Sequence, residues 1–253
     1  MAWTRRYDGP EPQRVNRWLA QNGVCSRRGA EDLIAQGLVS IDGETVADAG
    51  RKIEPGQTLL LADAASAKLE NALTVMLHKP AGVVSALPEP GQTAALSLLT
   101  GAALVGRSPA IPDRNSKLVP AGRLDKDSRG LLILSDDGVV AKAVIGPAST
   151  LDKEYRVAVI GDITPAKLNL LRHGMELDGR RLKPADVTVV SDQRLRVVLG
   201  EGRNRQIRRM CDLVGLKVVD LFRVRVGPLW LGTLPEGRWR VLSPDERAAL
   251  IAG

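Results

Sequence analysis

From residue 72 onward, short apolar segments of strand length occur in neighbouring pairs, and this pairing constrains the fold more than any other feature of the sequence. Segments 186–191 and 194–199 flank Asp192-Gln193, a spacing that is typical of a hairpin. Strand segments outnumber helical ones, and paired strands favour an antiparallel sheet over a doubly wound parallel sheet. We therefore predict an α+β fold in which residues 72–253 form a mainly antiparallel β-sheet with flanking helices.

The individual elements of this region follow from apolar periodicity. The predicted strands are 73–78, 82–85, 131–135, 155–160, 186–191, 194–199 and 218–226. The predicted helices are 139–145, 165–172, 204–214 and 244–252. Residues 101–117 are rich in Gly, Pro, Ser and Asn, so we expect a long loop there.

The first sixty residues follow a different pattern, in which helical spacing precedes short strands. Val15, Trp18 and Leu19 fit one helix, and a second helix begins after Ser26 as its N-cap and ends before Gly37. The predicted organisation is a flexible leader at 1–12, a small α/β domain at 13–61, a polar linker at 62–71 and the larger domain at 72–253.

Charge points to a polyanionic partner. The chain has 253 residues and a net charge of +7, and residues 200–225 alone carry seven basic and three acidic side chains. Such a concentration favours nucleic acid as the partner, with a solvated helix face as an equal alternative. We predict no membrane span, because no run of about 18 apolar residues occurs. Cys25 and Cys211 are too few for a disulfide framework or a structural zinc site, so we predict a cytoplasmic protein without a metal.

The N-terminal helix pair carries a candidate phosphate site. Arg27 and Arg28 stand on the first turn of the second helix, where backbone N–H groups already favour an anion. The segments that begin at Arg14 (Arg-Val-Asn-Arg-Trp-Leu), at Gly23 (Gly-Val-Cys-Ser-Arg-Arg) and at Gly37 (Gly-Leu-Val-Ser-Ile-Asp-Gly) resemble the S4 RNA-binding domain. The sequence departs from a Ser-x-x-Glu capping box, because glycine follows Ser26 at the third position.

Two further motifs with candidate site residues lie in the larger domain. Asp125 ends the motif Gly-Arg-Leu-Asp just before an apolar strand, and a carboxylate there has an accessible head on a rigid scaffold. Taken alone, Asp127, Asp136 and Asp137 are rivals to it. In helix 204–214, with Asn204 as a candidate cap, the apolar side chains share a buried face. We expect the remaining surface to bear the arginines Arg205, Arg208 and Arg209. Such a row can bind backbone phosphates, and one of its arginines can turn inward to pair with a buried carboxylate.

Together these motifs resemble the RsuA/RluF-type pseudouridine synthases, which carry an N-terminal S4 domain. The matching segments, in the order of the family, begin at His78 (His-Lys-Pro-Ala-Gly-Val-Val-Ser), Gly122 (Gly-Arg-Leu-Asp-Lys-Asp-Ser), Lys153 (Lys-Glu-Tyr) and Glu201 (Glu-Gly-Arg-Asn-Arg-Gln-Ile-Arg-Arg-Met). The resemblance implies that Asp125 is the catalytic aspartate, that Arg208 pairs with it and that Tyr155 contacts the uracil. It also implies that Arg123 helps to displace the target nucleotide. The expected RNA-binding residues are Arg14, Arg27, Arg28, Lys79, Arg203, Arg205 and Arg209.

The function that this resemblance implies is the isomerisation of uridine to pseudouridine in RNA, without a cofactor, by a protein that we expect to be a monomer. The Lys126-Asp127-Ser128 segment resembles the RluF-like branch of the family, and this resemblance implies large-subunit (23S) ribosomal RNA as the substrate. Small-subunit ribosomal RNA and tRNA stay open, as does a non-catalytic S4-type RNA-binding protein. A glycosidase is disfavoured because such enzymes use paired carboxylates, and no second carboxylate occurs in a comparable motif. Covalent attack by Asp125 and abstraction of a C2′ proton also stay open.

Overall fold

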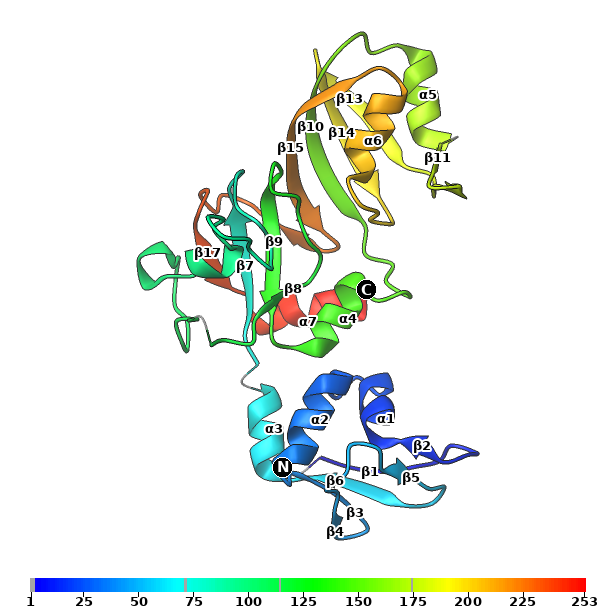
Figure 1. The fold of residues 1–253 in the computed structure, drawn as a ribbon, viewed down its shortest axis with the longest axis vertical. Helices are drawn as coiled ribbons and strands as arrows, with labels where there is room; N and C mark the ends of the chain where they lie inside the picture. The colour runs from blue at the N-terminus through cyan, green and yellow to red at the C-terminus, as the bar shows by residue number, and fades with distance from the viewer. Residues whose placement is uncertain (1–2, 71, 114, 174) are drawn as a thin grey trace. The chain divides into compact units, whose positions relative to one another are not determined.

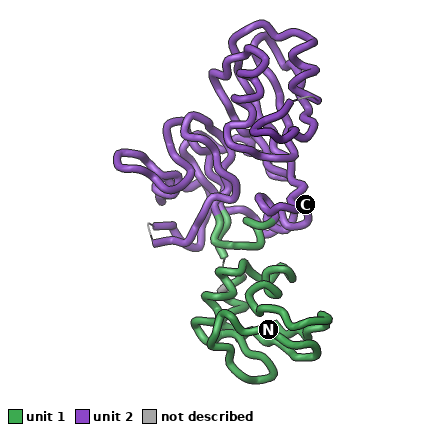
Figure 2. The backbone as a smooth tube through the Cα atoms, turned by 45° about the vertical axis from the view of Figure 1, so that its right-hand side comes forward, with its two compact units in different colours: residues 1–74, 135–142 green, residues 75–134, 143–253 purple. Residues whose placement is uncertain are grey.

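The computed structural model describes residues 3–70, 72–113, 115–173 and 175–253. They divide into two compact units, residues 1–74 with 135–142 and residues 75–134 with 143–253 (Figure 2). Of residues 1–12, predicted as a leader, 1–2 lie outside the described residues, as do residue 71 of the predicted linker and residue 114 of the predicted loop. No helix in the described ranges is both long and apolar enough to span a membrane.

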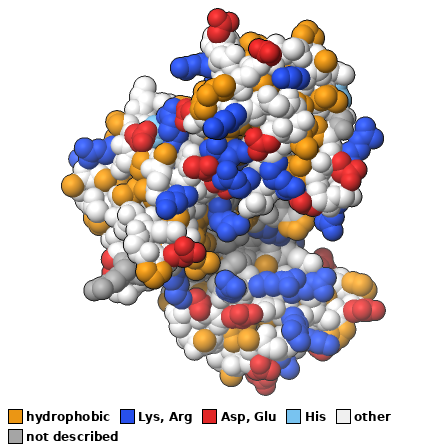
Figure 3. All heavy atoms as spheres, turned by 45° about the horizontal axis from the view of Figure 1, so that its top comes forward, with side chains coloured by type: hydrophobic (Ala, Val, Ile, Leu, Met, Phe, Trp, Pro, Cys, Tyr) orange, Lys and Arg blue, Asp and Glu red, His pale blue; other side chains and the backbone are white. Residues whose placement is uncertain are grey.

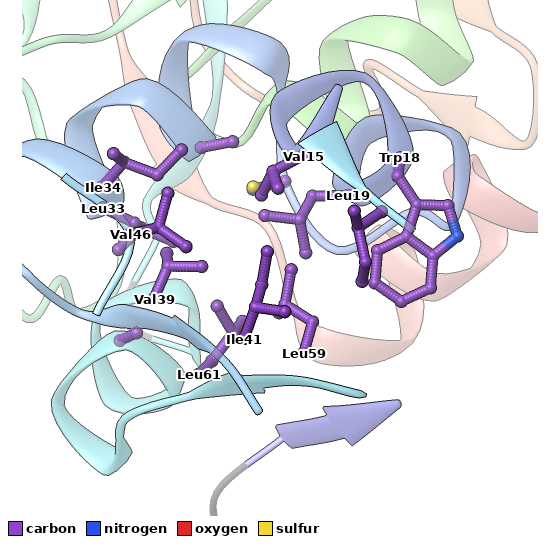
Figure 4. Packing of buried hydrophobic residues seen from close by; sticks show 14 of the residues in the cluster. Val15, Trp18, Leu19, Leu33, Ile34, Val39, Ile41, Val46, Leu59 and Leu61 are labelled. Atoms are coloured by element: carbon purple, nitrogen blue, oxygen red, sulfur yellow. The ribbon is translucent and has the colours of Figure 1, made fainter. Parts of the chain in front are cut away.

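The first unit is built on a sheet whose strand order is β1-β6-β3-β4 (Figure 1). These strands are β1 (Trp3–Arg6), β3 (Val39–Ile41), β4 (Glu44–Thr45) and β6 (Thr58–Leu61), with β2 (Gln13–Arg14) and β5 (Lys52–Ile53) as a separate pair. Its helices are α1 (Val15–Gln21), α2 (Arg27–Ala35) and α3 (Asp63–Glu70). Apolar side chains of α1 and α2 point toward those of β3 and β6, and together they form the core of this unit (Figure 4).

The second helix of this unit begins as predicted. The hydroxyl of Ser26 accepts a hydrogen bond from the backbone N–H of Gly29 at 3.0 Å, so the N-cap forms without the glutamate of a capping box. Gly37 follows the helix with a φ of 69°, a left-handed conformation that glycine adopts without strain.

Two predictions for this unit are wrong. The predicted leader contains β1, which pairs with β6 along its whole length, and Tyr7 is buried against the ring of Trp18. The predicted linker contains α3, whose Ala65 is fully buried in the core. Both segments are polar on average. However, the segment at 1–12 contains aromatic rings that can be buried. The segment at 62–71 contains the strong helix formers Ala, Leu, Lys and Glu.

The second unit is dominated by a sheet that has nine strands within the described residues, seven of them in the order β13-β14-β10-β15-β9-β7-β17. Their bounds are β7 (Thr74–Lys79), β9 (Arg129–Ser135), β10 (Lys153–Ile160), β13 (Asp186–Ser191), β14 (Arg194–Leu199), β15 (Lys217–Val226) and β17 (Trp239–Val241), and β8 (Val119–Pro120) and β16 (Leu229–Trp230) pair with β9 and β15. The pairing of β15 with β9 is parallel, whereas β13–β14, β14–β10, β10–β15 and β7–β17 are antiparallel. The predicted α+β class and mainly antiparallel sheet are thus confirmed.

Helices α5 (Pro165–His173) and α6 (Gln206–Leu213) lie on one side of this sheet, where α6 contacts β15 and α5 contacts β13 (Figure 1). The other regular elements of this unit are α7 (Pro244–Ala252), the short pair β11 (Glu176–Leu177) and β12 (Arg180–Arg181), and two 3₁₀ turns at Ala95–Leu98 and Gly101–Ala103. The second of these turns begins the predicted loop at 101–117. Helix α4 (Gly138–Ile145) is divided between the units, because residues 135–142 belong to the first.

Two local predictions for this unit need correction. Residues 82–85 do not form a strand, and only an isolated bridge joins Val84 to Ala94. The helix predicted to begin at Asn204 begins at Gln206. Its N-cap is Arg205, which has a left-handed backbone (φ 49°, ψ 33°).

Candidate active site

The loop between β8 and β9 carries the Gly-Arg-Leu-Asp motif, and one hydroxyl fixes its centre. Ser85 Oγ donates to the carbonyl of Leu124 at 2.6 Å and accepts from the N–H of the same residue at 2.9 Å. The Leu124 side chain is buried, so it anchors the loop a second time. Gly122 has a φ of 90°, which favours glycine at this turn. Asp125 therefore follows a segment whose backbone is held in place.

A buried arginine of β15 holds the same loop through hydrogen bonds to its backbone carbonyls. Arg223 donates from Nε to the carbonyl of Leu131 at 2.8 Å and from its terminal nitrogens to the carbonyls of Gly122 at 3.1 Å and Arg123 at 3.4 Å. Only 2% of Arg223 is exposed. The backbone of β9 approaches Arg223 closely at Gly130, where a Cβ would stand 2.2 Å from the Arg223 carbonyl oxygen. Sequence reasoning missed Arg223, although a charged residue at an inward position of an apolar strand was a usable signal.

The motif residues meet at a cavity of about 790 Å³ within the second unit. Its wall includes Arg123 and Asp125, from one sequence motif, and Tyr155, from another. Arg203 and Arg205 line the same cavity. Tyr155 is 9% exposed, whereas Arg123 is exposed at the surface. The cavity has the size of a small-molecule or nucleotide pocket.

Ion pairs at and beside the cavity differ from the pairing that the resemblance implied. The arginine within salt-bridge distance of Asp125 is Arg205, whose guanidinium nitrogen lies 3.7 Å from the carboxylate. Arg208 instead lies with Nε 3.3 Å from the Asp127 carboxylate, and it donates to the Asp127 carbonyl at 2.9 Å. The expected Asp125–Arg208 pair is therefore wrong in this structure. Arg208 is buried and its guanidinium turns inward toward the loop, as the sequence allowed for one arginine of this row.

Arg205 connects the two carboxylates. It donates to both oxygens of Asp127 at 3.1–3.2 Å. Partial burial opposes the charged form of Asp127, but the hydrogen bond from Arg205 and the charges of Arg208 and Arg205 outweigh it, so the Asp127 pKa is lowered. The left-handed backbone of Arg205 costs about 1–2 kcal/mol for a residue other than glycine. Such local strain is typical of functional sites.

Lysine side chains near the cavity are perturbed by burial. Lys79 is fully buried, and its ammonium donates to the carbonyls of Pro80 at 2.8 Å and Val83 at 2.7 Å. Burial lowers the pKa of Lys79 to about 8, although Asp127 and Asp125 oppose the shift. The expectation that Lys79 binds RNA is therefore wrong, because β7 places it in the interior. Burial also lowers the pKa of Lys153, which lines the cavity and which sequence reasoning did not single out.

The other predicted RNA-binding arginines are placed in two ways. Arg203 donates to the carbonyls of Leu177, Arg180 and Arg181, so it ties down the β11–β12 hairpin. Arg209 forms a bidentate pair with Asp178 at 2.7 and 2.9 Å. In the first unit Arg14, Arg27 and Arg28 are exposed. Figure 3 shows basic side chains, with acidic ones among them, gathered on one face of the second unit, which is the upper body in that view.

The second unit thus combines a mixed sheet, a cavity and an aspartate that lies on a held loop beside arginines. Comparison with known proteins gives the class of enzyme. Residues 73–213 match the family model of RNA pseudouridylate synthases, and residues 13–59 match that of the S4 domain. The chain belongs to the RNA pseudouridine synthase family and is an isomerase with an N-terminal S4 domain.

Individual relatives agree with this assignment over most of the chain. An uncharacterized RNA pseudouridine synthase of Aquifex aeolicus is 32% identical over 94% of this chain and 93% of its own length. The dual-specificity RNA pseudouridine synthase RluF of Escherichia coli K12 is 30% identical over 92% of this chain and 76% of its own length. A crystal structure of a pseudouridylate synthase superposes with a TM-score of 0.64 at 28% identity, and covers 94% of this chain and 99% of that one.

Proposed function

We propose that this enzyme isomerises a specific uridine of large-subunit ribosomal RNA and that Asp125 is its catalytic carboxylate. The observation that carries the proposal is the position of Asp125, which lines the cavity 3.7 Å from Arg205 on a loop held by Ser85 and Arg223. A carboxylate that attacks or takes a proton must be ionised, and a neighbouring guanidinium favours the ionised form.

Glu201 is the acidic rival in the cavity wall, but its oxygens are engaged by the scaffold. One oxygen accepts from the N–H of Lys183 at 2.9 Å and from the side chain of Gln206 at 3.2 Å. The other oxygen lies 3.4 Å from Nε of Arg203. These contacts support a structural role for Glu201, which links the hairpin, the loop and the start of α6.

The reaction breaks the bond between N1 of the uracil and C1′ of the ribose, turns the base and joins C5 to C1′. Asp125 either adds to the substrate and later leaves, or takes a proton from C2′ and returns it. The proton on C5 is lost to solvent as N1 gains one, so atoms and charge balance. A target base must leave its helix to reach the cavity. Arg123, exposed at the cavity wall, is placed to fill the gap, and Tyr155 offers a ring to the uracil.

The S4 unit is the second RNA contact in this proposal. Arg14, Arg27 and Arg28 are exposed, with Arg27 and Arg28 on the first turn of α2, where the helix N-terminus favours phosphate. We assign the protein to the cytoplasm because its substrate class is found there, and we expect a monomer. A relative named a dual-specificity RNA pseudouridine synthase supports a test of more than one RNA as substrate.

The catalytic assignment is tested with Asp125→Asn, which keeps the shape of the side chain and removes its charge. Tritium release from RNA labelled at C5 of uridine measures turnover. We expect none from Asp125→Asn, with RNA binding retained, and measurable turnover from Glu201→Gln. Turnover by Asp125→Asn would overturn the assignment.

The substrate is tested by mapping pseudouridines in total RNA from cells with and without this protein. We expect one site to disappear from large-subunit ribosomal RNA. A site lost only from small-subunit ribosomal RNA or from tRNA would move the proposal to that RNA. No lost site in any RNA would favour a non-catalytic RNA-binding role.

A further inference from the structure

Asp127 stands two residues beyond the proposed catalytic aspartate, and its carboxylate lies between two arginines. Both of its oxygens accept hydrogen bonds from Arg205 at 3.1–3.2 Å, and Nε of Arg208 lies 3.3 Å away. The backbone carbonyl of Asp127 also accepts from Arg208 at 2.9 Å. Asp127 therefore connects the loop of the Gly-Arg-Leu-Asp motif to both the cap and the first turn of α6.

The guanidinium of Arg205 is shared between two carboxylates. The same terminal nitrogen lies 3.1 Å from an oxygen of Asp127 and 3.7 Å from an oxygen of Asp125. The contact with Asp127 is two-pronged, which fixes the plane and the direction of the guanidinium. The contact with Asp125 is single and longer. The Arg205 guanidinium is thus held in place by Asp127, and one of its terminal nitrogens also faces Asp125.

We propose that Asp127 is a positioning residue, which holds Arg205 at the distance where its charge acts on Asp125. This inference rests on the proposed role of Asp125. An arginine that is 45% exposed would otherwise sample many side-chain conformations in solvent. The left-handed backbone at Arg205 fits this role, because it directs a residue that precedes the helix toward the loop. Buried Lys79 responds to the charges of both aspartates, so the two carboxylates and the cations act in one electrostatic site.

A second function for the same pair makes opposite predictions. If Arg205 binds an RNA phosphate and Asp127 only occupies it in the free enzyme, neutralising Asp127 strengthens RNA binding and leaves the rate of the chemical step unchanged. If Asp127 positions Arg205 for Asp125, neutralising either residue slows the chemical step, and the two losses are coupled. Rate and binding measured separately therefore distinguish the two functions.

The experiment uses the full chain in excess over total RNA taken from cells that lack this protein, labelled with tritium at C5 of uridine. The single-turnover rate of tritium release is compared for wild type, Asp127→Asn, Arg205→Gln and the double variant, and filter retention measures binding of the same RNA. We expect each single variant to lose about tenfold in rate, equivalent to about 1.4 kcal/mol. The double variant should be no slower than the slower single variant.

Asp178→Asn is the matched control, because Asp178 forms the same two-pronged contact with Arg209, four residues along from Arg205. It should keep the wild-type rate. Asp127→Glu restores the charge and should recover part of the rate, which separates positioning from a loss of folding. A wild-type rate in Asp127→Asn would overturn the inference while Asp125→Asn still tests the proposed function. An inactive wild type would overturn both.

Discussion

Arg223 is the buried cation beneath the loop of Asp125, and its replacement tests whether that loop must be held for catalysis. The substitution Arg223→Met keeps an unbranched side chain of similar length and removes every donor. The carbonyls of Leu131, Gly122 and Arg123 then lose their partner. The expected result is a less stable second unit and a slower chemical step, with RNA binding little changed.

The magnitude follows from the three contacts. The bonds to Leu131 at 2.8 Å and Gly122 at 3.1 Å have good length, whereas the contact with Arg123 at 3.4 Å is weak. A hydrogen bond from a charged group contributes about 1.5–3 kcal/mol, so the two good bonds contribute about 3–6 kcal/mol. Water can reach Gly122 through the cavity once the guanidinium is gone, and the free energy of burying a cation is regained, which lowers the loss to about 3 kcal/mol. For a unit of this size that is a fall in melting temperature of about 6–12 °C.

Thermal unfolding and single-turnover tritium release measure the two effects. Arg223→Lys keeps the charge with a single donor group and should lie between wild type and Arg223→Met. Arg194→Met, at an exposed arginine of β14, is the control and should change stability by no more than about 0.5 kcal/mol. The reasoning is refuted if the melting temperature of Arg223→Met equals that of the wild type. It is also refuted if stability falls while the folded enzyme turns over at the wild-type rate, since the loop would then not depend on its anchor.

Two further predictions concern Lys79 and the S4 unit. Because the Lys79 pKa is lowered to about 8 from 10.5, the unfolded chain binds more protons than the folded one between these values, and stability contributed by Lys79 rises with pH across that window. Lys79→Met should remove a rise of up to about 1.4 kcal/mol per pH unit; equal urea midpoint shifts between pH 8 and pH 10 in both proteins would contradict this. Replacing Arg27 and Arg28 together by Gln should reduce the slope of log binding constant against log salt concentration by about 1.4 in magnitude. This corresponds to about 0.7 for each lost phosphate contact. An unchanged slope would show that these arginines do not touch phosphate.

Regular elements were predictable where one physical signal dominated. The strands and helices of the second unit have strong apolar periodicity, and β13, β14 and α7 lie where the sequence placed them. The segments at 1–12 and 62–71 were misjudged because their average polarity conceals a few decisive side chains. Tyr7 and Ala65 are buried in the core of the first unit, and burial of a few such groups is enough to order a short segment.

The site was predictable as a set of residues and not as a set of partners. Asp125, Arg123 and Tyr155, for which the resemblance implied roles at one site, line one cavity. The resemblance could name an aspartate and an arginine for a pair, but it carried no information on which of several arginines would lie nearest. The burial of Lys79 was not predictable for a similar reason. At the end of a strand, the sequence alone does not distinguish a surface lysine from a buried one, because burial depends on how the sheet is assembled.

Arg205 lies next to Asp125 in place of Arg208, and the backbone at the start of α6 is the local cause. Helical spacing relates Arg205, Arg208 and Arg209 only if all three belong to the helix, and Arg205 precedes it with a left-handed conformation. Its side-chain direction is therefore set by that one backbone conformation, and it points to Asp127 and Asp125. Arg208, in the first turn of the helix, is buried and contacts the Asp127 carbonyl. Glycine adopts a left-handed backbone without strain and arginine does not, so we expect the contacts of the Arg205 side chain with Asp127 and Asp125 to offset this strain. The Asp127→Asn and Arg205→Gln variants test these contacts directly.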